Sequence, residues 1–165
     1  MSYIIYVRQH TGDIHMAHTF FAVYVHIVFS TKNRRRLLDA QVEPRIHAYL
    51  AAAVNKSGCK TITVGGCPDH VHMLVGLDQQ VAAADLIKEV KRQSSLWAKE
   101  EFPTMAEFSW QEGYAAFSVS YSNLTRVRAY IHRQAEHHKK MDWETELRGL
   151  LKKHGIAFDE RFFLG

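Results

Sequence analysis

Residues 69–75 read Asp-His-Val-His-Met-Leu-Val, a short apolar run in which one residue separates two histidines. Such a run predicts a β-strand. Successive side chains of a strand point to opposite faces, so His70 and His72 share one face and Val71 lies on the other. Two imidazoles side by side on a strand are a natural pair of metal ligands. Taken alone, the pattern also fits two polar residues on the solvated face of a strand.

The segments on either side of this strand alternate between strand-like and helix-like patterns. Runs rich in β-branched and aromatic residues predict strands over 18–30, 61–64 and 114–121. Residues 65–69 read Gly-Gly-Cys-Pro-Asp and predict a turn before the histidine strand. Apolar residues at helical spacing predict a first helix capped by Asp39 or Gln41 and ended by Gly58, and a second over 81–102. A third is capped by Ser122 or Asn123 and runs to about residue 140, and a last spans 143–154.

The order strand, helix, strand, strand, helix, strand, followed by helices, predicts an α+β fold. It is the split βαβ, or ferredoxin-like, pattern: an antiparallel sheet with two helices on one face, plus C-terminal helices. We expect the other sheet face to be free and His70 and His72 to point to it. Residues 18–165 are predicted to form a single domain, and residues 1–17 an N-terminal extension.

Composition narrows the classes of protein that the chain can belong to. The 165 residues carry a net charge of +4, which favours a polyanionic partner. No apolar run is long enough to span a bilayer, and residues 1–18 lack the pattern of a signal peptide, so we expect a cytoplasmic protein without a membrane partner. The two cysteines predict no disulfide framework.

Basic side chains cluster in three stretches, and each cluster is either a solvated surface or a set of phosphate contacts. The loop after the first strand holds three consecutive arginines, which favours phosphate contact there. The candidate phosphate-contacting residues are Lys32, Arg34, Arg35, Arg36, Lys88, Lys91, Arg92, Arg126 and Arg133.

The predicted helix over 122–140 carries a second set of candidate functional residues. Tyr130, Gln134 and His138 recur at spacing four, and residues four apart lie on one helix face. A phenol, a carboxamide and an imidazole therefore project together. The alternative is an ordinary helix with Tyr130 half in the core.

Several motifs together resemble a known family, and they occur in its order over residues 18–165. The histidine motif reads Pro68-Asp-His-Val-His-Met-Leu, and the helix motif reads Tyr130-Ile-x-x-Gln-x-Glu-His-His138. The first strand contains His26-Ile-Val-Phe-Ser-Thr-Lys, and the C-terminal segment ends Phe-Asp-Glu-Arg161. These stretches resemble the HUH-type single-tyrosine transposases of the insertion-sequence 200/605 family. Residues 1–17 precede the usual start of that family.

The resemblance implies an enzyme that cleaves and rejoins single-stranded DNA at insertion-sequence ends. Tyr130 would be the nucleophile and would form a 5′-phosphotyrosine intermediate. His70, His72 and Gln134 would hold a divalent metal: two nitrogens and an amide oxygen suit Mn²⁺, whereas the resemblance implies Mg²⁺ as the physiological ion. It also implies that the nine basic residues named above contact DNA. It further implies recognition of DNA hairpins at the element ends by a homodimer with shared active sites.

Three other interpretations remain open at this point. The first is a catalytically inactive or domesticated single-stranded nucleic-acid-binding protein on the same fold. The second is a zinc site formed by Cys59, Cys67, His70 and His72, although this spacing matches no common zinc module. The third is a rolling-circle initiator or relaxase, which shares the chemistry. We interpret Asp69 as a turn residue, while His137 and His138 either contact DNA, assist the site or end a solvated helix.

Overall fold

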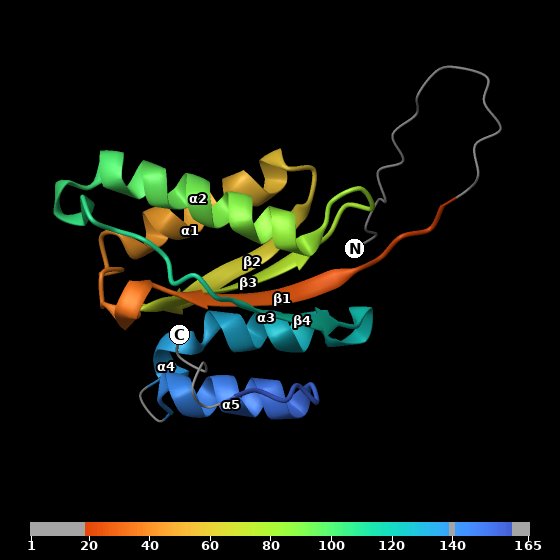
Figure 1. The fold of residues 1–165 in the computed structure, drawn as a ribbon. Coiled ribbons are helices and arrows are strands. Elements are labelled where there is room, and N and C mark those ends of the chain that lie inside the picture. The colour runs from red at the N-terminus through yellow and green to blue at the C-terminus, as the bar shows by residue number, and fades with distance from the viewer. Residues whose placement is uncertain (1–18, 139–140, 160–165) are drawn as a thin grey trace, which may run out of the picture.

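A four-stranded antiparallel sheet lies between two layers of helices in the computed structural model, which describes residues 19–138 and 141–159 (Figure 1). The strands are β1 (Tyr24–Ser30), β2 (Lys60–Cys67), β3 (His70–Gly76) and β4 (Ala115–Val119), in the spatial order β2-β3-β1-β4. The α-helices are α1 (Glu43–Lys56), α2 (Ala83–Glu101), α3 (Leu124–His132), α4 (Gln134–His137) and α5 (Trp143–Lys153). Three short 3₁₀ turns are η1 (Lys32–Arg34), η2 (Pro103–Met105) and η3 (Tyr121–Asn123). This is the predicted α+β, ferredoxin-like arrangement.

Helices α1 and α2 cover one face of the sheet and bury the larger part of the core. Alternate residues of the two central strands point to these helices, among them Ile27 and Phe29 of β1 and Val71 and Met73 of β3. The residues between them, including His70 and His72, point to the opposite face. The prediction that the two histidines share a face is therefore confirmed.

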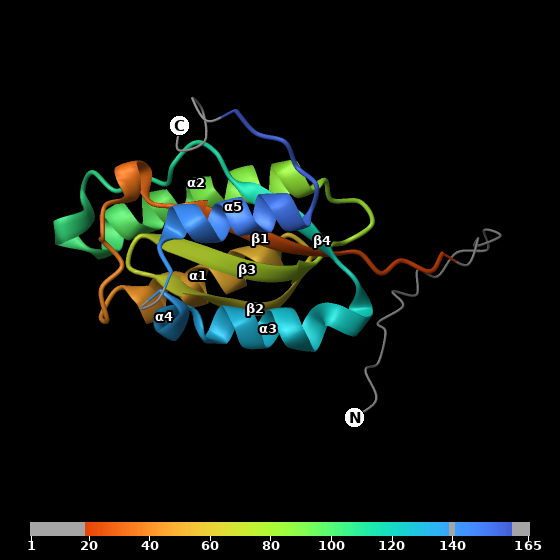
Figure 2. The ribbon, with the colours of Figure 1, turned by 90° about the horizontal axis from the view of Figure 1, so that it is seen from below.

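The opposite face of the sheet is not free, and that prediction was wrong. Helices α3, α4 and α5 lie across it, as the view from below shows (Figure 2). Trp143 and Leu151 of α5 pack with Val28 and Phe117 of the sheet in a second, smaller apolar cluster. The C-terminal helices therefore make the histidine face an interior surface.

The predicted turn over 65–69 is shorter than expected, because β2 continues through Cys67 and the chain turns at Pro68 and Asp69. The two glycines allow close packing, Gly65 between the sheet and α3 and Gly66 between neighbouring strands. A Cβ atom on Gly65 would lie 2.7 Å from the carbonyl oxygen of Ile131 on α3, and one on Gly66 would lie 2.3 Å from that of His70. Glycine is thus required where the backbones approach each other.

The predicted helix over 122–140 is broken within the tyrosine motif. Helix α3 ends at His132, and Arg133 has φ −100° and ψ 15° before α4 begins at Gln134. The N–H of Arg133 donates to the carbonyl of Tyr130 at 3.1 Å, a tight turn of the 3₁₀ type. The first strand is also shorter than predicted and begins at Tyr24.

Two further expectations concern the N-terminal extension and membrane-spanning helices. The proposed extension over 1–17 lies outside the residues that the structure describes. Within the described residues, no helix combines the length and the apolar character needed to span a bilayer.

Candidate active site

His70 and His72 are fully buried beneath α4 and α5, and each has its Nδ1 atom tied to a neighbour. The Nδ1 of His70 donates to Oδ1 of Asp69 at 2.7 Å. The Nδ1 of His72 lies 2.9 Å from Nε2 of His26 on β1. Since Nδ1 is engaged in both rings, Nε2 is the nitrogen left to act as a ligand.

Asp69 does more than the turn role that the sequence suggested. Its second oxygen, Oδ2, accepts a hydrogen bond from the guanidinium of Arg34 at 2.9 Å. Burial by itself raises the pKa of Asp69, but the hydrogen bonds from His70 and Arg34 outweigh it, so the pKa lies well below its usual range. Asp69 is therefore an ionised acceptor that fixes the ring of His70.

Burial keeps the histidines of this face neutral. It lowers the pKa of His72 to about 4, and burial together with the proximity of His72 lowers the pKa of His26 to about 3. The pKa of His70 is also lowered, again mainly by burial. A neutral imidazole is the form that binds a metal ion.

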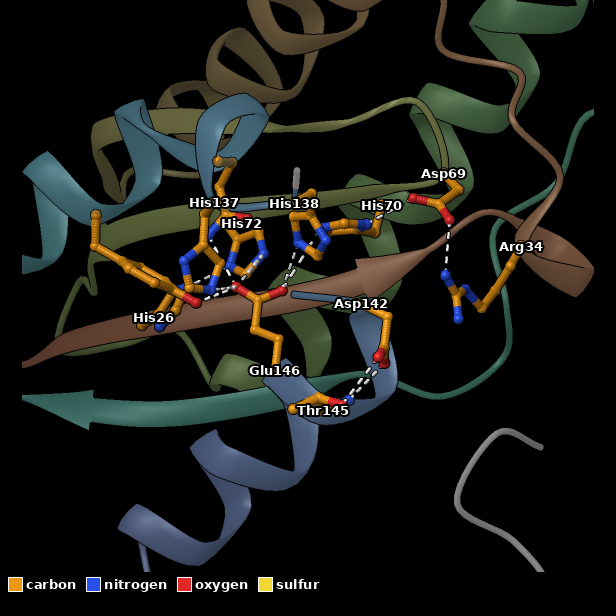
Figure 3. A network of polar contacts seen from close by, with 12 residues as sticks. His26, Arg34, Asp69, His70, His72, His137, His138, Asp142, Thr145 and Glu146 are labelled. Atoms are coloured by element: carbon orange, nitrogen blue, oxygen red, sulfur yellow. Dashed lines mark hydrogen bonds and ion pairs between the residues drawn. The ribbon is translucent and has the colours of Figure 1, made fainter. Parts of the chain in front are cut away.

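A carboxylate that the sequence analysis did not single out lies at the centre of the cluster. Glu146 extends from α5 toward the histidines and is 3% exposed (Figure 3). Its Oε1 accepts hydrogen bonds from the hydroxyl of Tyr130 and, at 2.9 Å, from Nε2 of Gln134. Its Oε2 lies 2.8 Å from Nε2 of His138. The three residues at spacing four thus converge on one side chain despite the break between α3 and α4.

The contact with Glu146 changes the proton affinity of both partners. Burial, together with the adjacent carboxylate, raises the pKa of Tyr130 above the ordinary value for a phenol. Burial alone raises the pKa of Glu146, but the surrounding side chains of His72, Tyr130 and Gln134 outweigh it and lower the pKa. At neutral pH the tyrosine is a protonated donor and the glutamate an ionised acceptor.

Three buried atoms of the cluster have no hydrogen-bond partner within the described part of the chain. They are Nε2 of His70, Nε2 of His72 and Oε1 of Gln134. Buried polar atoms are rarely left unpaired, so these three fit the donor set of a bound cation. These atoms belong to the three side chains that the family resemblance implies as metal ligands.

The distances between ligand atoms also indicate a metal site at this cluster. Within the described residues, ligand atoms of His70, His72, His138 and Glu146 lie within 4.8 Å of one another, so the cluster could bind a metal ion. That group contains neither cysteine. Cys59 lies in the core under α1 and α2, and burial raises the pKa of Cys67 to about 12, which disfavours a thiolate ligand. The structure therefore does not form the zinc site considered from sequence.

The nine basic candidates for DNA binding are divided between different parts of the molecule. Lys32, Arg35 and Arg36 are exposed beside η1, and Arg126 and Arg133 are exposed on and after α3. Arg34 is bound to Asp69, as described above. The remaining three lie on α2, on the other side of the sheet: Lys88, Lys91 and Arg92.

Two of the α2 residues already have partners in the chain. The ammonium of Lys91 donates to the carbonyl oxygens of Gln111, Glu112 and Gly113 at 2.6–3.0 Å, which holds the segment that enters β4. Arg92 is paired with Glu89 on the surface of α2.

Glu146 and His26 are the site residues that sequence reasoning missed. His26 stands in the first strand at a position of the same parity as other residues of the histidine face, which gave a weak signal. Glu146 lies three residues after Trp143 and four before Leu150, so helical spacing places it on the apolar face of α5, unlike Glu144. A carboxylate on that face was a signal that the sequence analysis did not use. Which side chains it meets follows only from the packing of α5 across the sheet.

Comparison with known proteins finds a matching family and several related transposases. The sequence profile described as "Transposase IS200 like" matches residues 19–134. The ISDra2 transposase TnpA of Deinococcus radiodurans is 26% identical over 120 residues, which cover 70% of this chain and 84% of that protein. The transposase for insertion sequence element IS200 of Salmonella typhimurium is 27% identical over 130 residues, with 75% and 84% covered.

Two solved structures share the fold. A candidate transposase from Deinococcus radiodurans has a TM-score of 0.59 at 22% identity and covers 72% of this chain and 95% of its own. A REP-associated tyrosine transposase bound to a REP hairpin has a TM-score of 0.57 at 14% identity, with 90% and 93% covered. Because the family profile spans most of the chain and includes the histidine and tyrosine motifs, this protein belongs to the IS200-like transposase family.

Proposed function

We propose that this IS200-like transposase cleaves and rejoins single-stranded DNA at insertion-sequence ends through a 5′-phosphotyrosine intermediate on Tyr130. One observation carries the proposal. The hydroxyl of Tyr130 lies in the same cluster as three ligand atoms that have no partner among the described residues, those of His70, His72 and Gln134. The rings of Tyr130 and His72 are 5.9 Å apart between centroids.

In the cleavage step, the phenolic oxygen of Tyr130 attacks the scissile phosphorus. The new bond joins Tyr130 to the 5′-phosphate, and the bond from phosphorus to the 3′-oxygen breaks. The phenol loses its proton and the leaving oxygen gains one, so the charge balances. Attack by another 3′-hydroxyl on the phosphotyrosine reverses this exchange and rejoins DNA without an external energy source.

The two histidines and Gln134 would hold Mg²⁺ or Mn²⁺. When bound, the ion would polarise the scissile phosphate and stabilise the leaving oxygen. The protein's own contribution is to present the donor atoms. Asp69 orients the imidazole of His70, and His26 orients that of His72. Glu146 accepts a hydrogen bond from the amide nitrogen of Gln134, so the amide oxygen of Gln134 is available to bind the ion.

Exposed cations near the site would contact the DNA backbone. Lys32, Arg35 and Arg36 follow β1 at the end of the sheet where Asp69 lies, since the N–H of Thr31 bonds to the carbonyl of Asp69 at 2.9 Å. One structural neighbour is bound to a REP hairpin, which supports a DNA hairpin as the ligand of this chain. The homodimer with shared active sites remains a prediction from the family resemblance.

The test is an adduct assay with the full chain and single-stranded oligonucleotides from both ends of the flanking genomic DNA. With Mn²⁺ or Mg²⁺ we expect a covalent protein–DNA adduct on a denaturing gel. Tyr130→Phe and EDTA should each abolish it, while hairpin binding by Tyr130→Phe stays within about twofold. Tyr121→Phe, which changes an exposed tyrosine, is the matched control and should keep the adduct.

Two outcomes would contradict the proposal. An adduct that persists in Tyr130→Phe would mean that another residue is the nucleophile. Tight hairpin binding by the unaltered protein without an adduct on either strand, with either metal, would favour the alternative of a non-catalytic nucleic-acid-binding protein.

A further inference from the structure

Glu146 is a buried carboxylate to which the proposed chemistry assigns no role beyond orienting Gln134. Four histidines lie within 4.0 Å of its oxygens: His70, His72, His137 and His138. Burial of an ionised carboxylate costs several kcal/mol unless its charge is compensated. Oε1 accepts hydrogen bonds from Tyr130 and Gln134, whereas the Nε2 atoms of His70 and His72 face the carboxylate without a hydrogen bond to it.

The distances from Glu146 to the two β3 histidines fit ligands of one ion better than hydrogen bonds. Oε1 lies 3.6 Å from Nε2 of His72, and Oε2 lies 3.8 Å from Nε2 of His70. Both separations are too long for a hydrogen bond. Two atoms that each lie about 2.1–2.3 Å from a shared ion, at angles of about 90–110°, are about 3.0–3.8 Å apart.

The directions of the free atoms agree with this reading. Nε2 of His70 and Nε2 of His72 are the unpartnered atoms of their rings, and these same atoms face the carboxylate. The buried group thus places two imidazole nitrogens, unpartnered within the described residues, beside a carboxylate. One divalent cation among them would satisfy all three.

We infer that Glu146 is a further protein ligand of the divalent ion, which makes α5 part of the metal site. The inference rests on the proposed function, since it concerns the same ion. A carboxylate oxygen beside two imidazoles and an amide oxygen gives the site the hard anionic ligand that Mg²⁺ and Mn²⁺ prefer. It also reduces the net charge buried at the site.

The local structure holds Glu146 in place for this role. Asp142 caps α5 by accepting from the N–H of Thr145 at 2.9 Å, which fixes the first turn of the helix. Trp143 packs on the ring of His70, with the centroids 4.4 Å apart. His138 contacts Oε2 of Glu146 and restrains the carboxylate. These contacts hold the first turn of α5 against the site.

The test measures Mn²⁺ binding by isothermal titration calorimetry with the full chain and without DNA. Glu146→Gln should weaken binding by about 10- to 100-fold, on the scale by which loss of metal-site groups lowers affinity. Glu144→Gln removes the same charge two residues away on α5, at a partly exposed position, and should stay within about twofold. The increase in melting temperature on adding MnCl₂ should shrink in Glu146→Gln alone.

A second measurement needs no variant, in case Glu146→Gln fails to fold. The unaltered protein is labelled with ¹³C at the glutamate carboxyl carbon, loaded with Mn²⁺ and examined by electron–nuclear double resonance. A strongly coupled ¹³C signal is expected from a carboxylate bound directly to the ion. Absence of that signal would overturn the inference.

Failure of the inference can be told apart from failure of the proposed function. If Mn²⁺ binding and adduct formation depend on His70 and His72, but Glu146→Gln binds Mn²⁺ as tightly as the unaltered protein, only the role of Glu146 is wrong. If the unaltered protein binds no Mn²⁺ and forms no adduct, the proposed metal-assisted cleavage itself fails.

Discussion

Each histidine of the β3 motif owes its ligand geometry to one neighbouring residue. Asp69 holds Nδ1 of His70, and His26 holds Nδ1 of His72. Neutral imidazole has one N–H and one lone pair, so donation from Nδ1 of His70 to the ionised Asp69 places its lone pair at Nε2. The same holds for His72 in the tautomer in which its Nδ1 donates to His26. Arg34 extends this chain of contacts by binding the second oxygen of Asp69. Arg34, predicted as a DNA contact, therefore helps to hold Asp69 against His70 inside the site.

Replacing Asp69 by Asn tests this arrangement. The amide has nearly the same shape, but it lacks the charge that binds Arg34 and favours the Nδ1–H form of His70. We expect Mn²⁺ affinity to fall by about 10- to 100-fold, with little change in helix content. Isothermal titration calorimetry measures the affinity, and Asp85→Asn, at an exposed position on α2, is the control. Equal affinity in the two variants would show that Asp69 is only a turn residue.

His47 on α1 gives the chain an acid-sensitive residue away from the site. Burial lowers its pKa to about 4, and its Nε2 has no hydrogen-bond partner among the described residues. The unfolded chain binds a proton at a pKa of about 6.5, above the folded value. The stability linked to His47 is therefore complete above about pH 6.5 and is lost as the pH falls toward 4.

His47→Gln should therefore lose less stability on acidification than the unaltered protein. Between pH 7 and pH 4.5, we expect the decrease in the free energy of unfolding to be smaller by roughly 1–2 kcal/mol. Urea denaturation at the two pH values measures it. The other buried histidines contribute equally to both proteins and cancel in the comparison. An identical decrease would refute the assigned role of His47.

At the scale of elements, the site depends on how closely α3 approaches the sheet. Gly65 of β2 faces the backbone of Ile131, one residue after Tyr130. Gly65, predicted as part of a turn, is thus the point on the sheet against which the tyrosine helix packs. A side chain at this position would move the helix that carries the proposed nucleophile.

Two glycine substitutions with opposite expected effects test this packing. Gly65→Ala would place Cβ 2.7 Å from the backbone oxygen of Ile131, so we expect a loss of about 1–3 kcal/mol in stability and reduced adduct formation. Gly149→Ala on α5 meets no atom within 4 Å and should raise stability by about 0.5–1 kcal/mol, since alanine favours a helix. Chemical denaturation measures both values. A neutral or stabilising Gly65→Ala would contradict the close approach.

At the scale of the whole molecule, a single chain brings together every residue of the candidate site. The strands supply the histidines, α3 and α4 supply Tyr130 and Gln134, and α5 supplies Glu146 (Figures 2 and 3). The family resemblance led us to expect sites shared between the subunits of a homodimer. The geometry of this chain needs no residue from a second copy.

Mixing two inactive variants separates these arrangements. Tyr130→Phe keeps the histidines, and His72→Ala keeps the tyrosine. If the site forms within one chain, we expect the mixture to give no more adduct than either variant alone. The readout is the denaturing gel used for the unaltered protein, after co-purification of the two variants with different tags. Recovery of adduct in the mixture would show that two chains share the site.

The sequence by itself determined the ferredoxin-like fold, the common face of His70 and His72, and the selection of Tyr130 and Gln134. These follow from local periodicity and from motifs, which depend on residues near one another in the chain. It did not determine the break at Arg133, the role of Gly65 or the position of Glu146. Each of these depends on α3 and α5 packing across the sheet, and contacts between distant segments leave no local pattern. Only the tertiary structure placed a carboxylate from the last helix among the histidines of the third strand.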